Sequence, residues 1–142
     1  MIQATIRGVR LATILLAAYW CLLFTATHIP KVPGVRIQHA DKVFHMVSYT
    51  GLAFLLAWAI PTIPRHKMLN VLMAGLFAIT YGIFDEFSQI PFGRHADIYD
   101  WVADSIGVFA GLMAYAVLRR QIVKRGKSQP TRSTKTLEAL QA

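Results

Sequence analysis

Hydrophobic residues are concentrated in four runs, which are separated by short polar segments. The runs cover residues 11–27, 43–60, 68–84 and 101–118, and each contains 17 or 18 residues. That length is close to the minimum for crossing a hydrocarbon core about 30 Å thick. Lipid offers the backbone no hydrogen-bond partners, so such segments must be helical. Because short connections join antiparallel neighbours, the pattern predicts an all-α polytopic membrane protein, built as an antiparallel four-helix transmembrane bundle.

The composition agrees with a membrane location. The chain has 142 residues, of which 55% are hydrophobic and 15% are charged, whereas a soluble domain is about 25% charged. We expect a membrane domain at residues 8–120 and a basic, flexible cytoplasmic tail at residues 121–142. The net charge of +8 does not indicate a nucleic-acid partner, because the basic residues flank the apolar runs. The single cysteine, Cys21, excludes an internal disulfide.

The first run has a second interpretation, as a cleaved signal peptide, because Arg7 and Arg10 precede it. Its centre contains Tyr19, Trp20 and Cys21. These bulky residues favour a retained membrane anchor.

The basic residues predict the orientation, since they accumulate on the cytoplasmic side of a membrane protein. Four of them fall in or beside the two connections predicted to face outward: Lys31, Arg36, Lys42 and Arg94. The other eleven lie in the N-terminal segment, the middle connection and the C-terminal segment. Both termini are therefore expected in the cytoplasm, with residues 85–100 outside. The basic part of the tail is expected to lie on inner-leaflet lipid.

Polar residues that share helical faces cluster at the predicted outer side. Asp41, His45 and Tyr49 are spaced by four, as are Asp85 and Gln89. On the last run, three aspartates follow the spacing i, i+3, i+7: Asp97, Asp100 and Asp104. Such spacings place side chains on one side of a helix, so the three groups are expected to converge in one pocket with Glu86.

Structural roles would account for part of this pattern. Asp97 has the position of a helix N-cap. Asp100 and Asp104 would pair with Lys42 and Arg94 to hold the helices in register.

The histidines favour structural roles, whereas the two adjacent carboxylates favour a functional one. His45 alone is more often a satisfied interior histidine than a ligand or a base. The other four histidines, His28 among them, are interpreted as interfacial or loop residues. Asp85 and Glu86 favour function, because two adjacent carboxylates at a membrane rim are seldom needed for packing.

The same residues resemble the VanZ-like family of small membrane proteins. The residues that carry this resemblance are Asp41, Lys42, His45, Tyr49, Asp85, Glu86, Gln89, Gly93, Arg94, Asp100, Gly107 and Gly111. The likeness runs over residues 31–118. Asp104 departs from it, since the family more usually places asparagine there. The resemblance implies a multi-pass protein of the bacterial inner membrane. The founding member is associated with resistance to the glycopeptide teicoplanin.

The expected site is a ligand-binding pocket, and its residues are Asp41, Lys42, His45, Tyr49, Asp85, Glu86, Gln89, Arg94, Asp100 and Asp104. In the first hypothesis it binds an envelope component, either a lipid headgroup or a lipid-linked wall precursor, with Arg94 and Lys42 on the phosphate. No catalytic residue, cofactor or metal is assigned. Membrane lipids are the expected partners, and the oligomeric state is left open.

The alternative is a membrane-embedded hydrolase or transferase. His45 would act as base, Asp85 or Glu86 as acid and Arg94 as anion stabiliser; a divalent metal held by His45 and carboxylates is a variant. The sequence has neither a His-Glu-x-x-His nor a Gly-x-Ser-x-Gly motif. A third reading, a proton-coupled transporter, would need four-helix chains to oligomerise.

Overall fold

The part of the chain that the structure describes forms four long helices. The computed structural model describes residues 5–6, 9–29, 40–61, 67–93 and 96–127. The helices are α1 (Leu11–His28), α2 (Ala40–Ala59), α3 (Lys67–Ser88) and α4 (Ile98–Lys127), with a short 3-10 helix η1 (Ile90–Phe92) after α3. The strands β1 (Thr5–Ile6) and β2 (Val9–Arg10) pair antiparallel ahead of α1, with Thr5 opposite Arg10. The all-α prediction is confirmed apart from this short hairpin.

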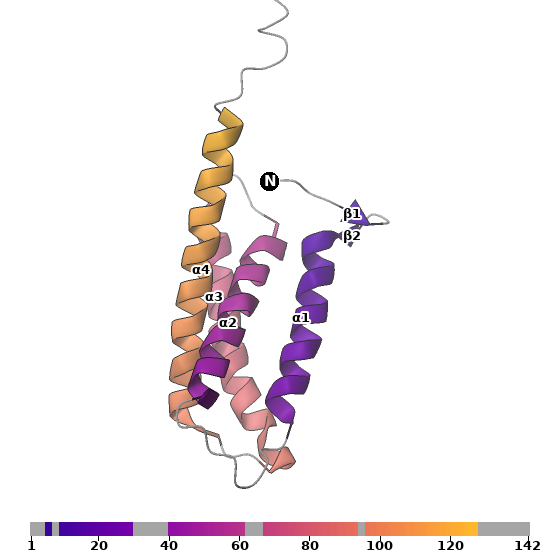
Figure 1. The fold of residues 1–142 in the computed structure, drawn as a ribbon, viewed down its shortest axis with the longest axis vertical. Coiled ribbons are helices and arrows are strands. Elements are labelled where there is room, and N and C mark those ends of the chain that lie inside the picture. The colour runs from indigo at the N-terminus through magenta and orange to yellow at the C-terminus, as the bar shows by residue number, and fades with distance from the viewer. Residues whose placement is uncertain (1–4, 7–8, 30–39, 62–66, 94–95, 128–142) are drawn as a thin grey trace, which may run out of the picture.

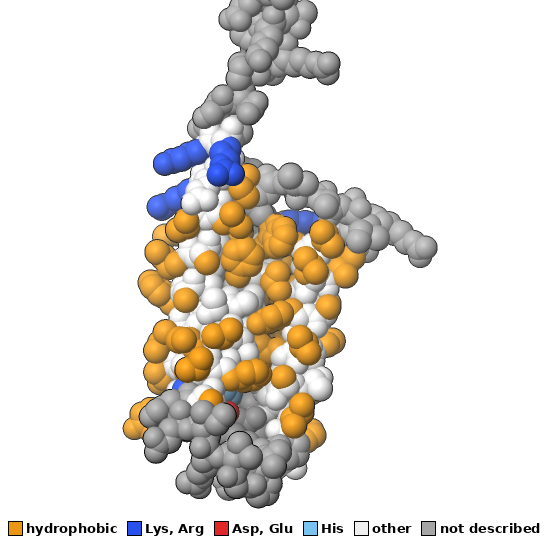
Figure 2. Space-filling model, viewed as in Figure 1, with side chains coloured by type: hydrophobic (Ala, Val, Ile, Leu, Met, Phe, Trp, Pro, Cys, Tyr) orange, Lys and Arg blue, Asp and Glu red, His pale blue; other side chains and the backbone are white. Residues whose placement is uncertain are grey.

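The helices run alternately up and down, and α2 is the central one (Figure 1). It packs against α1, α3 and α4. Its inner residues, among them Tyr49, Leu52 and Ala57, are completely buried. Large apolar side chains of the other helices, such as Leu22, Phe77 and Phe109, point outward. They cover the sides of the bundle, as a surface in contact with lipid requires (Figure 2).

Within the described residues, three segments are long and apolar enough to cross a membrane: Leu11–His28, Met68–Phe92 and Ile98–Arg125. α2 is not among them, because Asp41, Lys42 and His45 in its first turns make it more polar. Its 20 residues nevertheless extend about 30 Å at 1.5 Å per residue. The neighbouring helices cover its polar face, so the bundle accommodates a helix that lipid alone would not favour.

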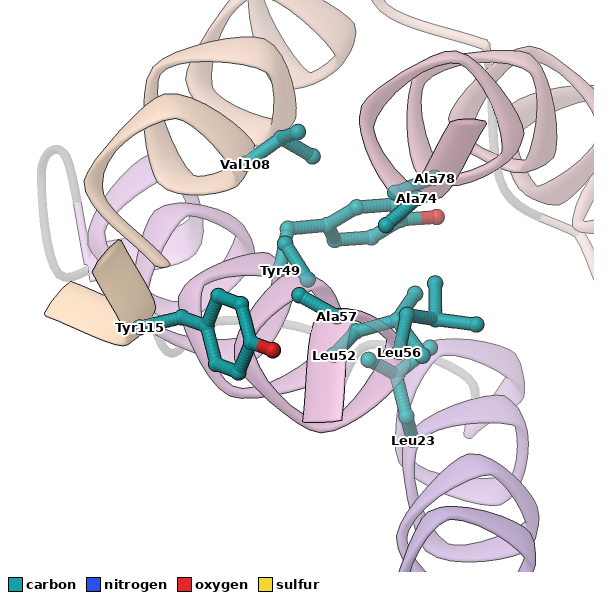
Figure 3. Packing of buried hydrophobic residues seen from close by; sticks show 10 residues of the cluster. Leu23, Tyr49, Leu52, Leu56, Ala57, Ala74, Ala78, Val108 and Tyr115 are labelled. Carbon is teal, nitrogen blue, oxygen red and sulfur yellow. The ribbon is translucent and has the colours of Figure 1, made fainter. Parts of the chain in front are cut away.

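The core is built on α2 (Figure 3). The Tyr49 ring lies against Ala74 and Ala78 of α3, and Leu56 of α2 meets Leu23 of α1. Small alanines opposite a large ring let the helices approach closely. That packing stabilises helix association in lipid, where the hydrophobic effect between helices is weak.

Two glycines set the contact between α2 and α4. A side chain on Gly107 would collide with the carbonyl oxygen of Met46, and one on Gly111 with that of Thr50. The backbones therefore touch along this seam. Two small residues one turn apart thus let two helices pack closely.

A side-chain contact ends α2 at one end of the bundle, and a glycine turn follows η1 at the other. At one end the Arg10 guanidinium donates hydrogen bonds to the carbonyl oxygens of Ala59 (2.8 Å) and Trp58 (3.4 Å). These carbonyls end α2 and have no partner within the helix, and a cation suits the negative end of the helix dipole. At the other end Gly93 adopts a left-handed conformation (φ 76°) after η1, which glycine adopts without steric cost.

Two helices extend beyond the apolar runs. α3 continues to Ser88, so Asp85 and Glu86 lie in its last turns rather than in a loop. α4 continues to Lys127, past residue 120 and into the segment predicted as a flexible tail. The rest of that segment, residues 128–142, lies outside the described residues.

Candidate functional site

His45 is the centre of a buried polar cluster. It lies in the second turn of α2 and has no exposed surface. Its Nδ1 atom is 3.0 Å from Asp104 Oδ1 and 3.8 Å from Glu86 Oε1. Its Nε2 atom is 4.0 Å from Asp100 Oδ2. Two helices, α3 and α4, thus bring carboxylates to an imidazole on α2. We call His45, Glu86, Asp100 and Asp104 the central cluster.

Lys42 completes the cluster at its rim. Its ammonium donates hydrogen bonds to Asp100 Oδ1 at 3.0 Å and to Asp97 Oδ2 at 3.1 Å. It also lies 5.5 Å from the centre of the Tyr99 ring. The expected pairing of Lys42 with Asp100 is confirmed, and Lys42 binds Asp97 as well.

Asp97 has two structural roles in addition to its ion pair with Lys42. Its Oδ1 atom accepts a hydrogen bond from the backbone N–H of Tyr99 (2.8 Å), which caps the start of α4 as the sequence indicated. Its own N–H donates to Glu86 Oε2 at 2.8 Å. Glu86 therefore ties the end of α3 to the beginning of α4, while its other oxygen faces His45.

Asp85 belongs to a neighbouring network rather than to the central cluster. Its Oδ1 accepts a hydrogen bond from Thr27 of α1 (3.1 Å), and its Oδ2 accepts one from Gln89 (3.0 Å). His28 extends this network through its Nε2 atom, which is 3.0 Å from the Ser88 hydroxyl oxygen. The last turns of α1 and α3 are thus joined by buried polar contacts.

The α1 residues of this network, Thr27 and His28, were not predicted from the sequence to belong to the site. His28 is the last residue of α1, is buried and stacks on Phe24, with ring centroids 3.9 Å apart, so it is not a loop residue. Thr27 is also buried. The available signal was that both polar residues end the first apolar run on the same side as Asp85.

Five buried polar atoms have no hydrogen-bond partner among the described residues. They are His45 Nε2, Glu86 Oε1, Asp104 Oδ2 and the hydroxyl oxygens of Tyr49 and Tyr81. Most buried polar groups in proteins are hydrogen-bonded to protein or to ordered water. Three of these atoms belong to the central cluster, which therefore has unused capacity for an additional bonding group.

A cavity of about 380 Å³ adjoins the cluster between α3 and α4. Its lining residues are Ile83, Glu86, Phe87, Ala96, Asp97, Ile98 and Trp101. Phe87 and Ile98 are also exposed on the outer surface of the bundle. The cavity is therefore almost entirely apolar, and it borders two residues that carry carboxylates.

The predicted site residues fall into three sets. His45 lies close to Glu86, Asp100 and Asp104, and Lys42 joins this set through Asp100. Asp41 has a carboxylate oxygen close enough to form a three-residue donor group with His45 and Asp100. Asp85 and Gln89 form the neighbouring network, and Tyr49 lies in the core. Arg94 lies outside the described residues.

Together, the fold and the cluster define a polytopic helical membrane protein with a carboxylate-rich polar site at one end of its bundle. The family model described as VanZ/LLP1 matches residues 5–119. The chain therefore belongs to the VanZ/LLP1 family, and the resemblance seen in its motifs is confirmed. Comparison with curated proteins and with solved structures gave no match.

Proposed function

We propose that the polar site binds a component of the cell envelope, either a lipid headgroup or a lipid-linked wall precursor. The cavity between α3 and α4 carries this proposal. Apolar side chains such as Phe87 and Ile98 form almost all of its lining, and two acidic residues, Glu86 and Asp97, border it. A hydrocarbon chain suits such a lining, and the polar part of a lipid-linked ligand would lie beside these acidic residues.

The chemistry of the cluster suits a ligand with several hydrogen-bond donors. Glu86 Oε1 and Asp104 Oδ2 are free acceptors, and sugar hydroxyls or amines would satisfy them. Lys42 already binds Asp97 and Asp100, so it is a weaker choice for the phosphate than the sequence suggested. Arg94 is left as the proposed phosphate residue, because its planar fork binds phosphate bidentately.

The proposed location is the outer face of a bacterial inner membrane, with both termini in the cytoplasm. Basic side chains of α4, including Arg119, Arg120 and Lys124, gather at the end of the bundle opposite the polar site (Figure 2). Arg10 lies at that end too, because it contacts the C-terminus of α2. This separation supports the orientation under the positive-inside rule.

One observation favours the enzymatic alternative. With Nδ1 of His45 donating to Asp104, the Nε2 atom would carry a free lone pair, and Nε2 has no hydrogen-bond partner among the described residues. A carboxylate that orients an imidazole in this way produces a general base. The second candidate is therefore a hydrolase that activates water on a lipid-linked substrate.

Lipid analysis of the purified protein tests the binding proposal. We expect Glu86→Gln to reach the membrane at near-normal levels but to lose at least about tenfold of the co-purifying lipid-linked component, since a lost charge-assisted hydrogen bond costs about 1.5–3 kcal/mol. Glu138→Gln is the matched control, because it makes the same change outside the family match. Equal lipid content in the wild-type protein and both variants would contradict the proposal. If the purified protein instead releases a product from a lipid-linked substrate that is added to it, the hydrolase would be favoured.

A cellular assay tests the part played by Arg94. Arg94→Lys keeps the charge and removes the planar fork. We expect the variant to accumulate normally but to lose any protection against glycopeptides that the parent protein gives. If the residue only held helices together, abundance would fall together with protection, because breaking a buried ion pair costs about 3–5 kcal/mol.

A further inference from the structure

We propose that His45, Glu86 and Asp104 bind a divalent first-row transition-metal ion. This inference deepens the proposed function, because the ion would lie beside the ligand cavity. The three residues come from α2, α3 and α4. Each offers a donor atom, and the three donor atoms lie within 4.8 Å of one another.

The donor spacing fits a common ion. Nδ1 of His45 is 3.0 Å from Asp104 Oδ1 and 3.8 Å from Glu86 Oε1. Donors bound to one ion at about 2.1 Å are separated by about 3.0 Å in octahedral and about 3.4 Å in tetrahedral geometry. The observed separations bracket the tetrahedral value, so small side-chain movements would complete the coordination.

Burial and unused bonding capacity point to an occupant. Glu86 is 5% exposed and Asp104 is fully buried. Glu86 Oε1 and Asp104 Oδ2 have no hydrogen-bond partner within the described part of the chain. Two buried carboxylates beside one imidazole are unfavourable without a compensating cation. A divalent ion would compensate both charges and bind Glu86 Oε1 together with the Asp104 carboxylate.

The surroundings resemble the support that metal-binding histidines receive. Such a histidine usually directs its second nitrogen to a carboxylate, which fixes the ring. Asp100 Oδ2 lies 4.0 Å from His45 Nε2, on the side away from Glu86 and Asp104. The other three-residue group, Asp41, His45 and Asp100, is less suitable because Lys42 already binds Asp100.

The mixed donor set indicates the class of ion. Imidazole favours zinc and neighbouring transition metals, whereas carboxylates also suit manganese. We therefore expect Zn²⁺ and Mn²⁺ to bind more tightly than Mg²⁺, which prefers oxygen ligands and retains its waters.

Metal binding to the full chain in detergent tests this inference. The protein, carried on a tag without histidines, would be stripped with chelator, exposed to Zn²⁺ or Mn²⁺, desalted and analysed for metal content. We expect one ion per chain, and at least about tenfold weaker binding in Glu86→Gln and Asp104→Asn. Asp85→Asn is the matched control, since Asp85 is equally buried but its carboxylate binds Thr27 and Gln89. It should keep its metal.

Thermal unfolding supplies a readout that does not depend on the variants. We expect Zn²⁺ to raise the midpoint of the wild-type protein, because an ion that binds only the folded state stabilises it. The inference would be overturned if the folded wild-type protein bound no metal saturably and its unfolding midpoint did not shift. It would also be overturned if the Glu86→Gln variant bound metal as tightly as the wild-type protein. If no metal binds but the protein still carries its lipid-linked component, the metal inference fails alone; if metal binds but no lipid does, the binding proposal fails alone.

Discussion

At the scale of single residues, the hydrogen bond between Thr27 and Asp85 joins α1 to α3. The threonine hydroxyl donates to a carboxylate that has no exposed surface. The loss of the donor to a buried acceptor destabilises the folded protein, because water cannot replace the hydrogen bond. This contact explains why a polar residue occurs near the end of an otherwise apolar helix.

Thr27→Val keeps the shape of the side chain and removes the donor. We expect the free energy of unfolding to fall by about 1–2 kcal/mol, in line with interhelical hydrogen bonds in membranes and with buried polar groups. Denaturant titration in detergent would measure the change. Thr25→Val is the matched control, because the exposed Thr25 bonds only to Cys21 of its own helix. Equal stability of both variants would mean that the Asp85 contact adds nothing.

At the scale of elements, the seam between α2 and α4 positions the central cluster. His45 lies on α2 and Asp104 on α4, one turn before Gly107. The close approach of the two backbones at Gly107 keeps the imidazole and the carboxylate within 3.0 Å. Packing and the site are therefore coupled in this region.

Gly107→Leu should separate the two helices, because the new side chain would fall against the Met46 backbone. Overpacking of this kind costs about 1–3 kcal/mol or more, so we expect less protein in the membrane and a broader size-exclusion peak. Ala110→Leu adds a large side chain on the exposed side of the same helix and should behave like wild type. Normal assembly of the Gly107 variant would show that the seam tolerates side chains.

At the scale of the whole molecule, charge is divided between the two ends of the bundle. Among the described residues, acidic side chains gather around His45. The basic side chains of α4 lie at the other end (Figure 2), where Arg10 contacts the end of α2. The prediction that both termini are cytoplasmic depends on this division, since the interior of the cell retains basic segments.

Cysteine labelling in intact cells tests the orientation. In a Cys21→Ala background, we expect a membrane-impermeant reagent to modify Gly93→Cys and to leave Gly126→Cys unmodified until the cells are opened. Gly93 is exposed at the end of the molecule that carries the polar site. Labelling of position 126 alone in intact cells would reverse the assigned topology.

The sequence by itself determined which segments are helical and which residues share a face. Apolar run length fixes the helices, because a backbone in lipid must satisfy its own hydrogen bonds. Helical spacing correctly grouped Asp100 with Asp104, and it placed His45 on the inner face of its helix. It also led to the family, through motifs that extend over several helices.

Only the tertiary structure decided which faces meet. His45 and Asp104 are 59 residues apart, and Thr27 and Asp85 are 58 apart. Periodicity gives the direction of a side chain relative to its own helix, but it carries no information about how one helix is rotated against another. That rotation depends on the packing of Gly107 against Met46 and of Tyr49 against small alanines. Contacts between distant residues therefore separated Asp85 from the central cluster and placed His28 in the interior.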